Sequence, residues 1–387
     1  MYESIDYYKL DDWFSDEEKM VRTTTRQFTE DRVIPIISEF HRKSEFPVDL
    51  VEEMGKIGLL GATLPEKYGC ASMNYTSYGL IMQELERGDS SIRSFASVQS
   101  SLVMFPIYKF GTEEQKNKWL PELASGKKIG CFGLTEPDFG SNPGGMMTTA
   151  TETSNGYRLN GTKMWITNGT IADAAIVWAK LQNKIRGFIV EKGTKGFKSN
   201  IIEGKFSLRA SNTSELIFED CEIPKENLLP LTDGLKSPLK CLTQARFGIA
   251  WGAIGAAMAC YSEVLNYSKT RIQFDKPIAA FQLVQEKLVY MVTEITKAQL
   301  LAIQMAKLLS ENKMKHTHVS LAKRNNVSIA LNIARQARGI LGANGILDEY
   351  NTIRHMLNLE TVSTYEGTHD IHTLVIGEDI TGISAFK

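Results

Sequence analysis

The period of the hydrophobic pattern changes twice along this chain of 387 residues, and this change constrains the fold more than any other feature. Residues 1–128 carry apolar positions at three- and four-residue steps, which is typical of helices. Residues 129–233 shift to alternation, with turn residues about every ten positions, which predicts short antiparallel strands in a small barrel or sandwich. Residues 234–387 return to long amphipathic patterns without proline after Pro277, which predicts an antiparallel helical bundle. The sequence therefore predicts an α+β protein of three domains.

Two local signals lie inside this framework. Ser15, followed three residues later by Glu18, fits a capping box at the start of a long helix. Asn160–Gly161 lies between two alternating runs in "YRLNGTKMWITNG" and predicts the turn of a hairpin. Neither a Gly-rich dinucleotide fingerprint after a strand nor a P-loop motif is present, so a nucleotide-binding α/β fold has no support.

Composition excludes several classes of protein. The formal net charge of −1 gives no reason to expect nucleic acid or an anionic membrane as a partner. The five cysteines are scattered without a CxxC pair, which fits a reducing compartment and disfavours a thiolate metal site. The apolar stretch 248–261 is too short to span a bilayer, so no membrane span is expected. We therefore expect a cytoplasmic protein, or a mitochondrial matrix protein whose leader has been removed.

Three segments together carry a family resemblance: "CFGLTEPDFGSNPGG", "MWITNG" and "RIQFDKPIAAFQLVQEKLVYM". In this order and spacing they resemble the acyl-CoA dehydrogenase flavoproteins, over essentially the whole chain. "RSFASVQSSL", "GKFSLRAS", "LGANGI" and "STYEGTHDIH" are most similar to the glutaryl-CoA dehydrogenases within that family. The resemblance implies a helical N-terminal domain, a β-barrel middle domain and a C-terminal four-helix bundle, assembled as a homotetramer. It also implies FAD as cofactor, partly bound by another subunit, and an electron-transfer flavoprotein as electron acceptor.

The resemblance assigns FAD contacts to residues that have plainer interpretations. Residues 132–141 could be only a strand and a turn, "MWITNG" only a hairpin, and Arg271 only a solvated charge. In the family pattern, Trp165 stacks on the flavin, Arg271 reaches the pyrophosphate across the subunit boundary, and Ser141 also contacts CoA. The complete set of implied cofactor contacts is Phe132, Leu134, Thr135, Ser141, Trp165, Thr167, Arg271, Phe274, Gln282, Gly342, Ala343, Thr368 and Asp370.

Glu366 in "TYEGT" is the candidate catalytic residue. By itself it could be an acid near the N-terminus of a following helix, favoured by the helix dipole. Removing a proton alpha to a thioester carbonyl, however, needs a carboxylate whose pKa is raised by burial. The family's catalytic segment matches residue for residue, so Glu366 is expected to be the base, with Gly367 leaving space for the thioester. Arg246 is expected near the base and the CoA chain, or else in a structural ion pair.

The segment "ERGDSSIRSFAS" predicts the substrate class. A charged Arg93 would be costly beside a plain fatty acyl chain unless the substrate brings a carboxylate. With Ser94 and Ser97, Arg93 is expected to bind a terminal carboxylate, since its guanidinium matches such a group in two places. The alternative is a helix–helix loop with solvated charges. Glu86 and Tyr365 match residues near the distal end of the acyl site in decarboxylating relatives.

The expected reaction is therefore oxidation of glutaryl-CoA and decarboxylation to crotonyl-CoA. Alternatives within the fold are a short-chain acyl-CoA dehydrogenase or oxidase and a non-decarboxylating glutaryl-CoA dehydrogenase. An alternative of another class is an inactive FAD-binding assembly protein. His369 and His372 lie near the candidate base, but no cluster of further ligands accompanies them, so no metal site is expected.

Overall fold

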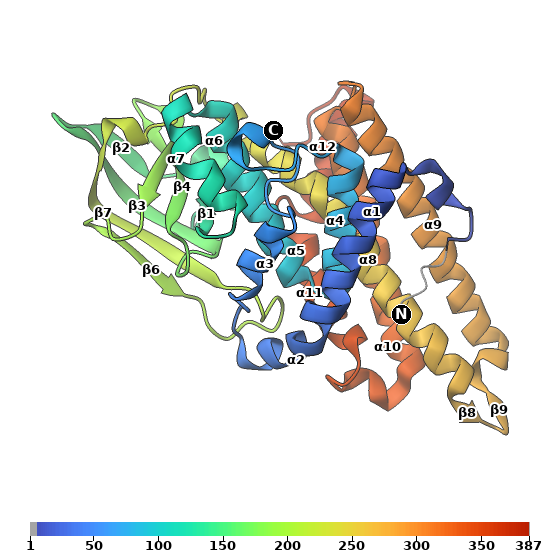
Figure 1. The fold of residues 1–387 in the computed structure, drawn as a ribbon. Helices are drawn as coiled ribbons and strands as arrows, with labels where there is room; N and C mark the ends of the chain where they lie inside the picture. Colours follow the sequence, from blue (N-terminus) through green and yellow to red (C-terminus); the bar gives the residue numbers. More distant parts are fainter. Residues whose placement is uncertain (1–5, 387) are drawn as a thin grey trace.

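The computed structural model describes residues 6–386, and its elements follow the predicted order of helices, strands and helices (Figure 1). Ser15 caps the first long helix as predicted, because its side chain accepts from the backbone of Glu18 while Glu18 binds the backbone of Ser15. The N-terminal helices are α1 (Asp16–Phe28), α2 (Ile34–Lys43), α3 (Leu50–Lys56), α4 (Tyr75–Gly88), α5 (Ser90–Ser97), α6 (Phe105–Phe110) and α7 (Glu113–Ala124).

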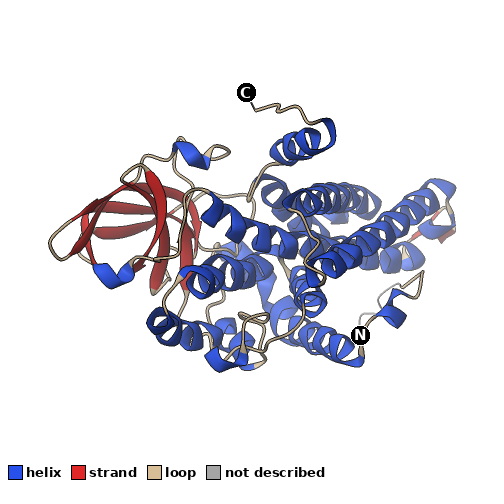
Figure 2. Cartoon of the chain, turned by 90° about the horizontal axis from the view of Figure 1, so that it is seen from above, coloured by secondary structure: helices blue, strands red, loops and turns tan. Residues whose placement is uncertain are grey.

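The described middle segment folds into a seven-stranded sheet with strand order β1-β4-β2-β3-β7-β6, and β5 pairs with β4. Its strands are β1 (Gly130–Gly133), β2 (Thr149–Glu152), β3 (Gly156–Thr167), β4 (Ala174–Leu181), β5 (Lys184–Glu191), β6 (Phe197–Ile201) and β7 (Thr213–Pro224). The sheet curves strongly (Figure 2), as a barrel-like domain requires. Pairing is mixed rather than wholly antiparallel, since β4 lies parallel to both β1 and β2.

The predicted hairpin at Asn160–Gly161 is wrong, because both residues lie inside the single strand β3. The register between β3 and β7 shifts between Leu159 and Gly161, so the pair marks a bulge. A Cβ on Gly161 would lie 2.5 Å from Oγ1 of Thr148, which explains why glycine is needed there. The local turn signal was therefore overridden by a tertiary contact with a neighbouring segment.

The C-terminal bundle consists of α8 (Lys236–Thr270), α9 (Gln282–Ser310), α10 (His316–Leu341), α11 (Asn351–Thr364) and α12 (His369–Thr381). A short hairpin, β8 (Ile272–Gln273) and β9 (Lys276–Pro277), joins α8 to α9 and projects from one end of the molecule (Figure 1). Helix α8, at 35 residues, is long and apolar enough to cross a membrane. However, 78% of its most apolar window is buried inside the protein, as expected of a core helix.

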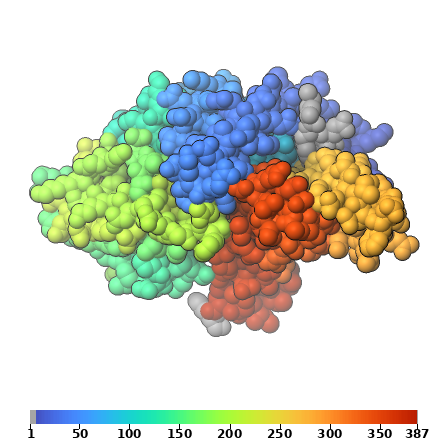
Figure 3. Space-filling model, turned by 90° about the horizontal axis from the view of Figure 1, so that it is seen from below, coloured from blue at the N-terminus to red at the C-terminus, as the bar shows by residue number. Residues whose placement is uncertain are grey.

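The two helical segments share one hydrophobic core rather than forming two separate bodies. Helix α4 lies so close to α8 that a Cβ on Gly79 would come within 2.4 Å of the Trp251 ring. Figure 3 shows the blue N-terminal segment against the orange and red C-terminal segment, with the green middle segment at the left. The division at residues 128/129 and 233/234 stays a prediction.

Hydrogen bonds attach the middle segment to α11, the helix that leads to Glu366. The backbone N–H of Leu208 donates to Oδ1 of Asn358 at 2.8 Å, and the Thr361 hydroxyl donates to the Ser207 hydroxyl at 2.5 Å. From the other side, Arg354 on α11 donates to Asp89, the N-cap of α5, at 2.9 Å. Helix α11 is therefore fixed against both the segment between β6 and β7 and the N-terminal helices.

Candidate active site

Glu366 lies in a strained turn between α11 and α12. Its φ is 51° and that of Gly367 is 96°, a left-handed region that side chains rarely adopt. A Cβ on Gly367 would lie 2.9 Å from Nε2 of His372, so only glycine fits without a shift. Thr368 begins α12 as its N-cap, with its hydroxyl accepting from the backbone of Ile371 at 3.1 Å. The turn thus presents Glu366 apart from both helices.

Two cationic side chains hold the backbone of this turn. Nε of Arg246, on α8, donates to the carbonyl of Glu366 at 2.6 Å. Nζ of Lys323, on α10, donates to the carbonyl of Gly367 at 2.6 Å and also to that of Tyr365. Three consecutive carbonyls therefore accept from cations that come from two helices of the bundle.

The carboxyl group of Glu366 has the properties of a general base. Its Oε2 atom is shielded from solvent and has no hydrogen-bond partner among the described residues. Burial raises the pKa of Glu366, and the charges of Lys323, Arg93 and Arg246 only partly counteract this effect. A carboxylate with raised proton affinity and an unengaged oxygen is suited to abstract a proton from carbon.

Arg93 lies fully buried beside the base. Its Nε donates to Oε2 of Glu86 at 2.5 Å, and its Nη2 donates to the hydroxyl of Tyr365. The alternative interpretation of this segment as a loop with solvated charges does not hold, because Arg93 and Glu86 are both 0% exposed. Burial works to lower the pKa of Arg93, but the charge of Glu86 raises it, so the guanidinium stays charged.

Two buried donors next to this ion pair have no partner among the described residues: Nη1 of Arg93 and the hydroxyl of Ser97. They are four residues apart on α5 and therefore share a face of the helix. Ser94 is also buried, but it follows Arg93 directly and points about 100° away around the helix. The structure thus places Arg93 and Ser97 on one face of α5, whereas Ser94 lies on a different face of the helix.

Sequence reasoning missed Gly252 of α8, on which the ion pair depends. A Cβ at this position would lie 2.0 Å from Oε2 of Glu86 and 3.0 Å from Nε of Arg93. Glycine therefore lets the pair lie directly against the helix backbone. The small residues of 248–261 indicated close helix packing, but not what would pack there.

Lys323 was also missed, although its helix gives a signal. Val319 and Val327, four residues before and after it, are both buried on α10, which places Lys323 on the same inward face. Its side chain is 1% exposed. The four-residue spacing of Lys323 from two buried apolar residues was therefore the signal that could have revealed its burial.

On the sheet, the predicted flavin contacts only partly converge. Trp165 is 61% exposed with a φ of 64°, and the N–H of the preceding Met164 donates to the carbonyl of Thr135 at 2.9 Å. Thr135 and Trp165 are therefore neighbours, with Thr167 further along the same strand. The side chains of Phe132 and Leu134 are buried in the core, so only their backbone could face a ligand.

Other predicted cofactor contacts lie at a distance. Arg271, Phe274 and Gln282 are exposed at or beside the β8–β9 hairpin, at the end of the molecule opposite the sheet (Figures 1 and 2). The remaining predicted contacts are half-buried or exposed and lie in a loop, after α10 and at the start of α12: Ser141, Gly342, Ala343, Thr368 and Asp370. One chain therefore does not bring the hairpin residues to Trp165.

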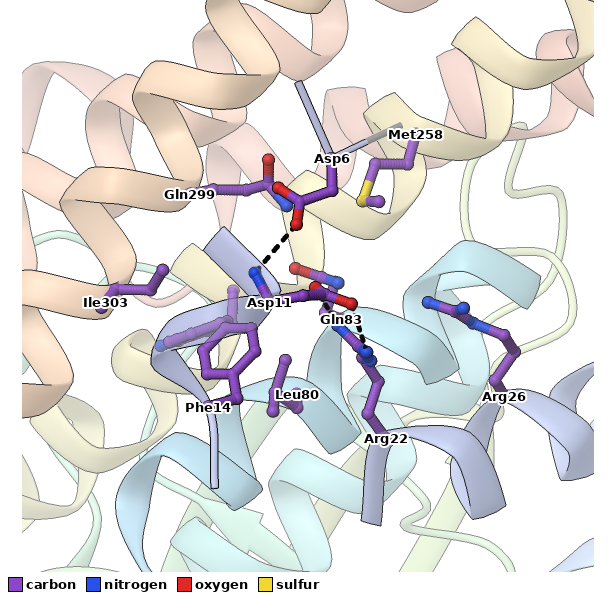
Figure 4. A pocket seen from close by; sticks show the side chains of 11 residues that line it. Asp6, Asp11, Phe14, Arg22, Arg26, Leu80, Gln83, Met258, Gln299 and Ile303 are labelled. Carbon is purple, nitrogen blue, oxygen red and sulfur yellow. Dashed lines mark hydrogen bonds and ion pairs between the residues drawn. The ribbon is translucent and has the colours of Figure 1, made fainter. Parts of the chain in front are cut away.

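A separate small cavity lies near the N-terminus between α1, α4, α8 and α9 (Figure 4). Its volume of about 10 Å³ suits roughly one water molecule. Arg22, which lines it, is paired with Asp11 at 2.5 Å. None of the predicted site residues lines this cavity, so it is distinct from the cluster around Glu366.

Comparison with known proteins agrees with this architecture along the chain. Three family models match: the acyl-CoA dehydrogenase N-terminal domain over residues 15–127, the middle domain over 131–221 and the C-terminal domain over 232–381. The human mitochondrial short-chain specific acyl-CoA dehydrogenase is 38% identical over 364 residues, which cover 92% of this chain and 88% of that protein.

Solved structures add a second group of relatives. A glutaryl-CoA dehydrogenase from Mycobacterium smegmatis, in complex with FADH2, is 48% identical, with a TM-score of 0.98 over 100% of both chains. Another structure of glutaryl-CoA dehydrogenase from that organism is 49% identical, with a TM-score of 0.97 over 99% of each chain. The chain therefore belongs to the acyl-CoA dehydrogenase family.

Proposed function

We propose that this protein oxidises glutaryl-CoA between its alpha and beta carbons, with FAD as cofactor, and decarboxylates the product to crotonyl-CoA. The observation that carries the proposal is the buried Arg93, which has one unengaged guanidinium nitrogen. The likeness to glutaryl-CoA dehydrogenases over the full chain supports the same substrate.

The charge balance around Glu366 favours an acyl group that carries a carboxylate. Among the described residues, three cations converge here, Arg93, Arg246 and Lys323, against the carboxylates of Glu86 and Glu366. With Lys323 protonated and Glu366 ionised, the cluster carries one positive charge in excess. A distal carboxylate on the substrate balances that charge, whereas a plain butyryl chain leaves it buried and uncompensated.

Glu366 performs the proton transfer. Its carboxylate takes the alpha proton of the thioester while the turn held by Arg246 and Lys323 keeps the carboxylate in place. After oxidation, loss of CO₂ from the distal carbon leaves a dienolate conjugated with the thioester. The protonated Glu366 then returns its proton to that carbon, which gives crotonyl-CoA.

The residues on the sheet fit FAD. The Trp165 ring is a large apolar surface, 61% exposed, on which a flat heteroaromatic ring system can stack. Thr135 and Thr167 lie close to Trp165 along the backbone and offer hydroxyl groups for hydrogen bonds to such a ring. Bound FAD supplies the acceptor for the beta hydrogen, which leaves as a hydride. Arg271, Phe274 and Gln282 would complete the site from another subunit of a homotetramer. An electron-transfer flavoprotein would then accept the electrons.

Anaerobic titration of the purified holoprotein tests this proposal. Glutaryl-CoA should bleach the flavin absorbance at lower concentration than butyryl-CoA and should release CO₂ in proportion to turnover. Bleaching by glutaryl-CoA without CO₂ would favour a non-decarboxylating enzyme. A preference for butyryl-CoA would contradict the glutaryl assignment and favour a short-chain acyl-CoA dehydrogenase, in keeping with the human relative.

A further inference from the structure

Lys323 is a buried cation without a carboxylate hydrogen-bonded to it among the described residues. It lies on α10 with 1% of its surface exposed, and its ammonium group donates to the carbonyls of Tyr365 and Gly367. These two residues flank Glu366 on either side. The ammonium also lies 5.7 Å from the centre of the Tyr365 ring, a cation–π distance.

Its position on α10 is itself fixed by the core. Asn326, nearly one turn further along the helix, donates to the carbonyl of Ala250 on α8 at 2.9 Å. Ser320 and Val327 are buried on either side. Lys323 therefore projects from a rigid helix toward the turn, rather than following the movements of that turn.

The turn needs such support, because its backbone is unfavourable by itself. Glu366 is a non-glycine residue with a φ of 51°, and residues in this region persist only where their surroundings hold them. Arg246 holds one carbonyl of this turn, that of Glu366. Lys323 bridges the carbonyls before and after it and thus determines the direction in which the Glu366 side chain leaves the backbone.

We propose that Lys323 is a positioning residue for Glu366: it clamps the two flanking carbonyls and directs its positive charge toward the catalytic carboxylate. The inference rests on the proposed role of Glu366 as the base. It extends that role by naming the residue that keeps the base aimed and ionised in a buried site.

The charge of Lys323 acts in a definite direction. It lowers the pKa of Glu366 against the effect of burial, which raises it. In turn, burial lowers the pKa of Lys323 to about 7, while the charge of Glu366 works to raise it. The other charged or titratable groups that face Glu366 among the described residues are Tyr78 on α4, Arg93 on α5, Arg246 on α8, the adjacent Tyr365 and His372 on α12.

Removal of the ammonium should therefore raise the pKa of Glu366. The base would become ionised only at higher pH, so the acidic limb of a pH–rate profile would move upward by about one unit or more. A residue with a purely structural role would lower the rate at all pH values and leave the limb where it is.

Exchange of the alpha proton with D₂O measures this step without hydride transfer. The probe is 3-thiaglutaryl-CoA, in which sulfur replaces the beta carbon and the distal carboxylate is kept, so that an alpha proton can be lost but no beta hydrogen is present. Exchange is followed by NMR from pH 5 to 9 with the holoprotein, for wild type, Lys323→Met and Lys323→Gln. Arg324→Gln is the matched control, because Arg324 is the adjacent cation on α10 and donates to Thr373, away from the turn.

The proposal predicts that both Lys323 variants shift the acidic limb upward, and that Arg324→Gln leaves it unchanged. Lys323→Gln, which keeps an N–H donor for one carbonyl, should retain a higher plateau rate than Lys323→Met. An unmoved limb in either folded Lys323 variant would overturn the proposal. Absence of exchange in the wild type would instead contradict the assignment of Glu366 as the base, and the inference would fail with it.

Discussion

The acyl side and the flavin side of this molecule are built in different ways. On the acyl side, Arg93 donates hydrogen bonds to both Glu86 and Tyr365 beside Glu366, within one chain. On the flavin side, Trp165 is 61% exposed on the sheet and Phe274 is 86% exposed on a hairpin at the other end of the chain. In our proposal, the first site is formed within a single subunit, and the second is completed by another subunit.

This difference indicates which properties each region controls. Buried charges with fixed partners discriminate between substrates, because an unmatched group there costs free energy that water cannot recover. Exposed aromatic and cationic side chains carry little cost by themselves and gain their role on assembly. We therefore expect substrate choice to depend on residues within one chain, and flavin retention to depend on the oligomer.

The largest effect is expected from pairing two variants that are each nearly inactive. Glu366→Gln removes the base and should lower flavin reduction by about 10²–10⁴-fold. Arg271→Ala should lose FAD, since a charge-assisted hydrogen bond contributes about 1.5–3 kcal/mol. If each flavin site uses Glu366 of one subunit and Arg271 of another, random co-assembly should restore about one site in four.

Activity of the co-expressed, FAD-supplied pair is the measurement, with each variant purified alone as control. A co-assembled sample no more active than the better single variant would contradict the shared flavin site. Such a result would not contradict the proposed role of the acyl side, since neither Arg93 nor Glu86 is changed in these variants.

A smaller but more selective effect is expected at Gly252. In Gly252→Ala, the new Cβ would lie 2.0 Å from Oε2 of Glu86 and must displace the Glu86–Arg93 pair. Overpacking of this kind costs about 1–3 kcal/mol, so kcat/KM for glutaryl-CoA should fall roughly 5- to 140-fold, and that for butyryl-CoA should fall less.

Gly377→Ala is the matched control for this helix substitution, because a Cβ at Gly377, on α12, meets no atom within 4 Å. It should leave both substrates unchanged. Equal losses on the two substrates in Gly252→Ala would show that the glycine serves general packing rather than the ion pair.

Local sequence patterns predicted the fold where the pattern and the packing agree. Ser15 and Glu18 formed the capping box, because its hydrogen bonds are made within one turn. Asn160–Gly161 gave a wrong prediction of a hairpin turn. The pair instead forms a bulge in β3, where Thr148 of a neighbouring segment packs against Gly161. Period and capping are local properties, whereas a bulge depends on what lies across the sheet.

The candidate site shows the same limit. Glu366 and Arg93 could be named because their segments resemble those of the family and their residue types suit acid–base chemistry and carboxylate recognition. Lys323 was missed although it lies in phase with the buried Val319 and Val327, because its carbonyl partners lie more than forty residues away in sequence. Arg271 could be named only by resemblance, because the surface that it is expected to complete belongs to another subunit.

The most direct test of the central claim compares two substrates in one double variant. Arg93→Met with Glu86→Gln removes both charges of the pair, so no buried carboxylate is left without its cation. The single variant Glu86→Gln, which keeps Arg93, is the control and should still prefer glutaryl-CoA. Steady-state kcat/KM is measured for glutaryl-CoA and butyryl-CoA, which share the same CoA, base and flavin.

If Arg93 binds the distal carboxylate, the glutaryl-to-butyryl ratio of kcat/KM should fall by at least about tenfold in the double variant, since a hydrogen bond to a charged group contributes about 1.5–3 kcal/mol. Butyryl-CoA should lose little, or gain. An unchanged ratio, with both substrates reduced alike, would contradict the claim that this buried cation selects the substrate.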